Sequence, residues 1–260
     1  MVRGDLMLYI VITVLVLCLL LFTYMLFLAF QTNVKEHSLC VKEIPKGEQF
    51  HIFFISDIHR RKIKDELIHS IIGKVDVVVI GGDLTEKGVP LNRTAFNLKQ
   101  LKKLGPVFYV YGNNDREVGE SNLLTLFESL DIHILNNSSV VLSNLNPSLR
   151  LVGINDGFVG KVNIAEAFED VKEEDILIFV THAPAFFHAA QKISNPRLML
   201  AGHLHGGQIR IGPLGIYEKG SFRLKENKAE LISNGFGTTG VPLRLGAKPE
   251  CHIITLKGCK

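Results

Sequence analysis

The longest apolar stretch of the chain lies near its N-terminus, from Leu6 to Phe30, and contains no charged residue, glycine or proline. About 20 apolar residues suffice to cross the hydrocarbon core of a bilayer, so this run predicts one transmembrane helix. Tyr9 and Tyr24 would lie near the two interfaces. A cleaved secretory signal is the alternative, but its apolar region is usually about 7–15 residues and ends at a small-residue site. Residues 1–30 are therefore expected to be an uncleaved membrane anchor.

The charges beside this run say little about its orientation in the membrane. Arg3 precedes it, whereas Lys35, Lys42 and Lys46 follow it, interleaved with glutamates. Lysine and arginine dominate the positive-inside rule, so the balance leans weakly towards a cytoplasmic location for the rest of the chain and leaves the side open. The polar residues 31–48, which include a proline and a glycine, are expected to form a short tether.

From residue 49 onward, apolar runs alternate with amphipathic segments. The periodicity predicts strands over 51–56, 75–80 and 107–111 and helices over 65–73, 90–104 and 121–130. Further along, strands are expected at 132–135, 140–142, 150–154, 175–180, 198–200, 208–211, 222–224, 230–233 and 252–256, and helices at 164–171 and 185–191. Helices that alternate with apolar strands imply parallel or mixed sheets. Residues 49–260 are therefore expected to form one α/β domain with two packed sheets flanked by helices.

Composition changes this picture only slightly. A net charge of +3, without a basic stripe that carries interleaved aromatics, indicates no nucleic-acid partner. Cys18 lies in the apolar run, and none of the four cysteines forms a C-x-x-C pair. The spacing allows, without demanding, a disulfide between Cys40 and either Cys251 or Cys259.

Polar side chains with metal-ligating chemistry follow the apolar runs that predict buried strands. They are Asp57, His59, Asp83, Asn113, His182, His203 and His205. Side chains two positions apart at a strand end project to the same side, so Asp57 and His59 can face one cation. The two carboxylate oxygens of Asp83 allow this residue to bridge two metal ions. Carboxylates, amide oxygens and imidazoles together suit Mn²⁺, Fe²⁺ or Zn²⁺.

Taken singly, each of these residues has an ordinary explanation. A strand-end aspartate is usually a cap or turn residue, a lone histidine is usually a surface or hydrogen-bonded core residue, and Gly-Asn is a common turn. Taken together, two carboxylates and four imidazoles at the ends of buried strands would be costly without a partner. Two divalent metal ions supply that partner, at the strand ends where open α/β folds place their active sites.

The ordered motifs D-x-H, G-D, G-N-x-D, H and G-H-x-H over residues 56–207 resemble those of the calcineurin-like metallophosphoesterase superfamily. The segments 202–208 and 237–244 also resemble a bacterial subgroup, the small and often membrane-associated YkuE/YaeI-type phosphoesterases. The resemblance implies a four-layer α/β-β/α sandwich of two mixed sheets. It also implies that one metal is held by Asp57, His59, Asp83 and His205, and the other by Asp83, Asn113, His182 and His203.

The implied activity is hydrolysis of phosphodiesters or phosphomonoesters by a hydroxide that bridges the two metals. Two such ions, about 3.5–4 Å apart, generate the hydroxide, neutralise the phosphate and hold it for in-line attack. Many members of the superfamily have a histidine after the Gly-Asn pair, which is thought to protonate the leaving group, but here this residue is Asn114. An amide only donates or accepts hydrogen bonds, so the general acid is unassigned. Asp115 is expected to orient the site from behind the ligands.

The substrate is less well determined than the reaction. Arg60 and Arg61, directly after D-x-H, and Arg244, in a Gly/Thr-rich loop, are candidates to bind the phosphate, although the first two could equally be a solvated charge pair. An anchored site is compatible with phospholipid head groups, undecaprenyl- or nucleotide-linked precursors and cell-wall phosphodiesters. A precursor pyrophosphatase is the alternative activity. A non-catalytic membrane scaffold of the same fold is disfavoured because all seven ligand positions are intact.

Overall fold

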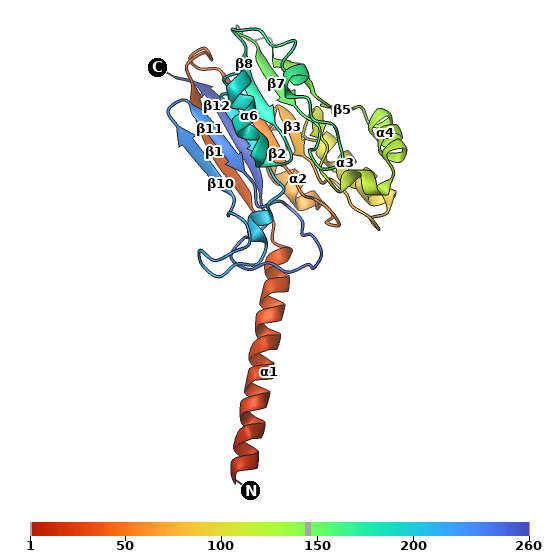
Figure 1. Ribbon diagram of the computed structural model, residues 1–260, viewed down its shortest axis with the longest axis vertical. Helices are drawn as coiled ribbons and strands as arrows, with labels where there is room; N and C mark the ends of the chain where they lie inside the picture. The colour runs from red at the N-terminus through yellow and green to blue at the C-terminus, as the bar shows by residue number, and fades with distance from the viewer. Residues whose placement is uncertain (1, 144–146, 260) are drawn as a thin grey trace.

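The computed structural model describes residues 2–143 and 147–259 and separates a long N-terminal helix from a layered domain (Figure 1). Helix α1 (Val2–Ala29) projects from one end of the domain. Its segment Asp5–Ala29 is, by length and composition, long and apolar enough to cross a membrane. The last turn of α1 packs against the domain, where Leu28 and Ala29 are buried.

The first sheet is mixed and has the strand order β1-β12-β2-β3-β4-β5. Strands β2 to β5 run parallel to one another, β12 is antiparallel to β2, and β1 is parallel to β12. The strands are β1 (Val34–Val41), β2 (Gln49–Ile55), β3 (Val77–Gly81), β4 (Val107–Val110), β5 (Ile132–Ile134) and β12 (Cys251–Gly258).

The second sheet is also mixed and has the order β10-β11-β9-β8-β7-β6. Its central strands β11, β9, β8 and β7 are parallel, and both edge strands, β10 and β6, pair in the antiparallel direction. The strands are β6 (Ser138–Ser143), β7 (Leu149–Gly153), β8 (Ile176–Val180), β9 (Leu198–Ala201), β10 (Ser221–Lys225) and β11 (Lys228–Ile232).

Helices cover the outer face of each sheet, which makes four layers. The first sheet is covered by α2 (Asp65–Ile71), α3 (Leu91–Lys102) and α4 (Glu120–Ser129), and the second by α5 (Ile164–Ala167) and α6 (Phe187–Ile193). Three short 3₁₀ helices, η1 (Asp115–Val118), η2 (Pro184–Phe186) and η3 (His205–Gly207), follow strand ends. The predicted fold class, two mixed sheets between helices, is confirmed.

Alternation along each buried strand builds this sandwich. In β2, Ile52 and Phe54 lie in the core between the two sheets, whereas Phe53 and Ile55 pack against the helices on the outer face. Continuous apolar runs are the expected sequence of strands that are buried on both faces. The parallel strands therefore lie at the centre of the molecule, and their carboxyl ends face one edge of the sandwich.

The prediction of a tether over residues 31–48 is wrong for Val34–Val41, which form the edge strand β1. Leu39 and Val41 are buried in the core between the sheets, whereas most other side chains of the strand remain partly or fully accessible. An edge strand with one open side is polar enough to look like a linker. Helix α1 therefore joins the domain with almost no intervening chain.

The prediction of a strand over 208–211 is also wrong. Ile209 and Ile211 form isolated bridges with Leu245, Gly246 and Leu214 instead of a strand. Gln208 has a φ of 56°, which turns the backbone out of the extended conformation directly after η3.

Candidate metal centre

The seven predicted ligands all follow strands whose carboxyl ends meet at one edge of the sandwich. Asp57 and His59 follow β2, Asp83 follows β3, and Asn113 follows β4. His182 follows β8, and His203 and His205 follow β9 in the second sheet. The structure brings these side chains together, although up to 148 residues separate them along the chain (57 to 205).

One group of donors consists of Asp57, His59 and His205, whose ligand atoms lie within 4.8 Å of one another. The Nε2 atoms of His59 and His205 are 3.1 Å apart, and Nε2 of His205 is 3.4 Å from Oδ1 of Asp57. Oδ2 of Asp83 lies 3.6 Å from Nε2 of His59. These are the four residues expected to hold the first metal.

A second group surrounds His182. Its Nε2 is 3.3 Å from Oδ2 of Asp83, 3.2 Å from Oδ1 of Asn113 and 3.2 Å from Nδ1 of His203. The Asp83 carboxylate therefore faces both groups and lies where a shared ligand is required. That these residues bind metal ions stays a prediction, which the chemistry of the donor set can test.

Two histidines have tautomers that leave a lone pair facing the site. Nδ1 of His182 donates to the carbonyl oxygen of Gly81 at 2.9 Å, and Nδ1 of His59 lies 2.9 Å from Oε2 of Glu86. In the neutral form of each ring, the remaining Nε2 then points a lone pair at other acceptors, and only a proton on Nε2 or a bound cation removes this repulsion. Mn²⁺, Fe²⁺ or Zn²⁺ at each group would satisfy these donors, so the residues fit the implied ions.

Glu86 was not predicted, because a charged residue followed by a lysine is typical of an exposed loop. It is nevertheless buried, and it holds both His59 and the Arg60 guanidinium. Its position three residues after Asp83 was the only signal in the sequence.

Five of the seven candidate ligands have a left-handed backbone: Asp57, His59, Asp83, His203 and His205, with φ between 49° and 73°. This conformation costs a non-glycine residue about 1 kcal/mol, and such residues concentrate at functional sites. Each turn redirects the side chain as the strand ends, so that groups from two sheets converge on one point.

The motif glycines allow the ligand segments to approach closely. A Cβ on Gly112 would lie 2.2 Å from both the backbone nitrogen and Oδ1 of Asp83. A Cβ on Gly202 would lie 2.3 Å from Oδ2 of Asp57. A side chain at either position would displace a candidate ligand, which explains glycine in the G-N and G-H motifs.

The electrostatics of the second group couple metal binding to pH. Burial lowers the pKa of His182, but the charges of Asp83 and Asp57 and the hydrogen bonds to Asp83 and the Gly81 carbonyl together outweigh burial and raise this pKa to about 10. Burial raises the pKa of Asp83, and the His182 and His59 charges more than reverse that effect, so its pKa is well below the usual range. Without metal, these two residues therefore form a buried ion pair at neutral pH.

A metal ion needs the deprotonated Nε2 of His182, so binding should release about one proton at pH 7. Metal affinity should fall about tenfold for each unit of pH below the raised pKa of His182. Calorimetric titration of the metal-free chain in two buffers with different ionisation enthalpies measures this proton release. A heat of binding that is the same in both buffers would contradict the buried ion pair.

Asp115 lies behind Asp83 rather than in the site. Its fully buried carboxylate accepts hydrogen bonds from the backbone nitrogens of Asp83, Thr85 and Gly112 at 2.8–3.0 Å. Burial and the neighbouring Asp83 carboxylate raise the pKa of Asp115 to about 7, against the effect of these donors. Asp115 thus holds the loops that carry Asp83 and Asn113, and its orienting role in catalysis stays a prediction.

Asn114 binds the shared carboxylate directly. Its backbone nitrogen donates to Oδ1 of Asp83 at 2.9 Å, and its Nδ2 donates to Oδ2 at 2.8 Å. Asn114 therefore positions Asp83, and its amide cannot supply a proton to a leaving group.

The prediction that Arg61 and Arg244 bind substrate is wrong, because backbone carbonyls occupy both guanidinium groups. Arg61 donates to the carbonyls of Phe236, Phe30 and Gln31, and it stacks on the Phe236 ring. Arg244 is fully buried and donates to carbonyls that include those of His205 and Asn234. Arg60 is exposed and paired with Glu86, so a role in substrate binding stays a prediction for this residue.

A pocket of about 490 Å³ opens on the candidate ligands. Asp83, Asn113, His203 and His205 line it together with Asn114. Other lining residues come from the following loops and are largely apolar: Leu204, Ile209, Ile216 and Tyr217, with Gln208 and Thr239.

The fold and the paired donor groups define a metallophosphoesterase. The chain belongs to the calcineurin-like phosphoesterase family, whose model matches residues 50–207. It is therefore a metal-dependent phosphoric ester hydrolase by class, and the site has the donors for two metal ions.

Individual relatives cover most of the chain. The Bacillus subtilis protein YpbG is 40% identical over 228 residues, which is 87% of this chain and 88% of that protein. Escherichia coli phosphodiesterase YaeI is 31% identical over 232 residues, covering 80% and 82% of the two chains. The Bacillus subtilis metallophosphoesterase YkuE is 27% identical over 250 residues, covering 85% and 84%.

Proposed function

We propose that this protein is a membrane-anchored phosphodiesterase, with phosphomonoesterase activity, that uses two divalent metal ions. The observation that carries the proposal is the convergence of two donor groups on one carboxylate, Asp83. The similarity to a protein named phosphodiesterase supports hydrolysis of diesters. The apolar segment Asp5–Ala29 supports anchoring.

When bound, the metals would supply a hydroxide nucleophile and neutralise the charge of the phosphate. The first would be held by Asp57, His59, Asp83 and His205, and the second by Asp83, Asn113, His182 and His203. Glu86 and the Gly81 carbonyl fix the tautomers of His59 and His182, so their Nε2 lone pairs stay directed at the site. Asn114 holds Asp83 in place and donates no proton, so esters with good leaving groups should react faster.

The test uses the full chain in detergent, stripped of metal and reconstituted with Mn²⁺ or Zn²⁺. We expect hydrolysis of bis-p-nitrophenyl phosphate and p-nitrophenyl phosphate that depends on the added metal and stops with chelator. Metal bound in stoichiometric amounts without turnover of either ester would overturn the proposal. A nucleoside-diphosphate lipid as the sole hydrolysed substrate would favour the alternative activity, a precursor pyrophosphatase.

The disulfide between Cys40 and Cys259 bears on which side of the membrane the domain occupies. Their Cα atoms are 5.5 Å apart, and the bond joins the end of β1 to the chain after β12, whereas Cys251 is free and buried. Structural disulfides persist in oxidising compartments. We infer from this bond that the domain faces the exterior, against the weak lean of the flanking lysines towards the cytoplasm.

Trapping thiols with a membrane-impermeant reagent on intact cells tests this orientation. Cys40 and Cys259 should react only after addition of an external reductant. If Cys40 and Cys259 are labelled without reductant in rapidly lysed cells but are not labelled in intact cells, both are free thiols in the cytoplasm and the inferred orientation is wrong.

A further inference from the structure

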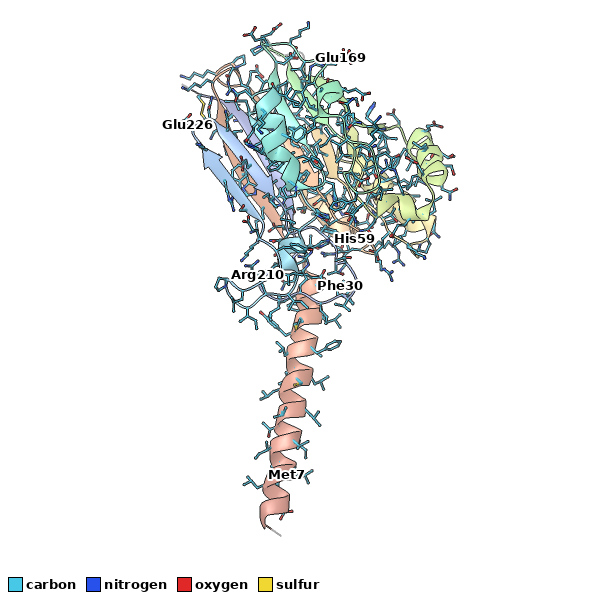
Figure 2. The ribbon with its side chains drawn as sticks, viewed as in Figure 1. Met7, Phe30, His59, Glu169, Arg210 and Glu226 are labelled. Atoms are coloured by element: carbon cyan, nitrogen blue, oxygen red, sulfur yellow. A yellow bond between two sulfur atoms is a disulfide. The ribbon has the colours of Figure 1, made fainter. Side chains whose placement is uncertain are left out.

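The metal centre lies at the end of the domain from which α1 projects. Figure 2 shows His59, Arg210 and Phe30 at this end, whereas Glu169 and Glu226 lie towards the opposite end of the domain. The contacts agree with the picture, because Arg61, two residues after His59, donates to the carbonyls of Phe30 and Gln31. With the anchor in a bilayer, the candidate ligands therefore lie close to the membrane surface.

A second contact fixes the position of the surrounding loops along the axis of α1. The backbone nitrogen of Arg244 donates to the carbonyl of Met25 at 3.1 Å, and its guanidinium donates to the carbonyl of His205. Helix α1 continues beyond Met25 to Ala29, about 6 Å further along the helix axis at about 1.5 Å per residue. The loop that carries Arg244 thus lies beside the last turn of α1, where Phe27 is exposed while Leu28 and Ala29 are buried against the domain.

An exposed apolar loop, Ile211–Tyr217, lies next to this junction, because the backbone nitrogen of Arg210 donates to the carbonyl of Leu245, the residue after Arg244. Ile211, Leu214, Ile216 and Tyr217 are 74%, 74%, 80% and 54% exposed, and no residue of the loop carries a charge. In Figure 1 the light-blue chain of this region lies beside the domain end of α1. Four large apolar side chains in water on one short loop are unusual for a surface that has no partner.

The apolar loop has a fixed shape. The buried Arg210 guanidinium donates to the carbonyls of Gly206, Gly212, Pro213 and Tyr217 at 2.9–3.2 Å. Ile211 and Leu214 exchange two backbone hydrogen bonds. Because these polar backbone groups are satisfied internally, the loop can enter an apolar phase without losing hydrogen bonds.

The same loop forms part of the pocket. Ile216 and Tyr217 line it together with Asp83, His203 and His205. Gln208 joins the two loops that border the pocket, since its side chain donates to the Thr239 and Val241 carbonyls and accepts from the Thr239 nitrogen. Val241 is itself 52% exposed, which extends the apolar surface around the pocket.

We propose that the apolar loop inserts into the membrane interface beside α1, so that the metal centre opens onto lipid head groups. Its substrates are then phosphoesters carried on bilayer lipids, which reach the ligands without leaving the membrane surface. This inference rests on the proposed membrane anchor and phosphoesterase function. The exposed side chains of the apolar loop contact the head-group and upper acyl region of the bilayer, where interfacial apolar side chains lie.

The position of the loop is tested without any catalytic readout. In a Cys18→Ser background, Leu214→Cys and Leu224→Cys are each labelled with an environment-sensitive fluorophore, and the full chain is reconstituted in vesicles of phosphatidylcholine and phosphatidylglycerol. Leu224 is the matched control, because it is 58% exposed and lies two residues before Glu226, at the far end of the domain in Figure 2. The probe at 214 should shift to the blue and lose about half its emission to spin-labelled lipid, whereas the probe at 224 should do neither.

Turnover tests the substrate class. In vesicles with bound Mn²⁺, Ile211→Ser/Leu214→Ser should hydrolyse a phosphodiester lipid about tenfold more slowly than the unchanged chain, and soluble bis-p-nitrophenyl phosphate at the same rate. Leu224→Ser should leave both rates unchanged. An equal loss on both substrates, or no loss on either, would overturn the proposal, as would equal quenching at 214 and 224. If no ester is hydrolysed by the unchanged chain, the proposed function fails, and the quenching still decides where the loop lies.

Discussion

Asp83→Asn should lower metal-dependent turnover by at least about a thousandfold on every phosphoester, because it removes the charge that the two proposed metal ions would share. The carboxylate faces His59 at 3.6 Å and His182 at 3.3 Å, and both of its oxygens accept hydrogen bonds from Asn114. An amide of the same shape keeps the packing but not the second anionic oxygen. Elemental analysis should accordingly find less than the full complement of two metals per chain.

Asp131→Asn is the control for this prediction. Asp131 has nearly the same left-handed backbone as Asp83, with φ of 52° against 50°, and it also pairs with a cation, Lys102. It lies on the surface directly before β5, at the amino end of the parallel strands, whereas the candidate ligands follow the carboxyl ends. Turnover by the Asp131→Asn variant should therefore equal that of the unchanged chain. A fall of the same size in both variants would mean that the loss reflects backbone strain rather than the metal centre.

The candidate ligands were predictable because two simple patterns coincide. Buried parallel strands have continuous apolar runs, and their carboxyl ends meet at one edge of a sheet, so a polar residue directly after such a run has a predictable location. Asp83 after Val77–Gly81 and His182 after Ile176–Val180 illustrate this. The residues that support the ligands were not predictable. Glu86, for example, contacts His59 only because its loop folds back onto that residue, and the sequence does not indicate this fold.

The errors also have physical causes. Arg61 and Arg244 were expected to bind phosphate because arginines near a phosphate site usually do, but here they replace water as donors to carbonyls that folding leaves without partners. Sequence periodicity does not reveal such carbonyls. Strand β1 was taken for a tether because an edge strand needs apolar residues only where it touches the core, at Leu39 and Val41.

Asn114→His should restore a general acid and raise turnover of esters with poor leaving groups relative to good ones by about tenfold or more. An imidazole can protonate a phenolate with a pKa of about 10, which departs slowly without help, whereas p-nitrophenolate needs little protonation. The measurement compares phenyl with p-nitrophenyl phosphodiesters at saturating metal.

Asn114→Ala separates this effect from the second role of the residue. Alanine keeps the backbone hydrogen bond to Oδ1 of Asp83 but loses the one from Nδ2 to Oδ2. It should therefore slow both esters to a similar extent, by about tenfold, through a less well-held carboxylate. Asn114→His also loses the side-chain amide, so the alanine variant controls for that loss. If the rate of the phenyl ester relative to the p-nitrophenyl ester rises in Asn114→His but not in Asn114→Ala, the rise is due to proton donation. An unchanged ratio in both variants would mean that the leaving group takes its proton elsewhere in the site.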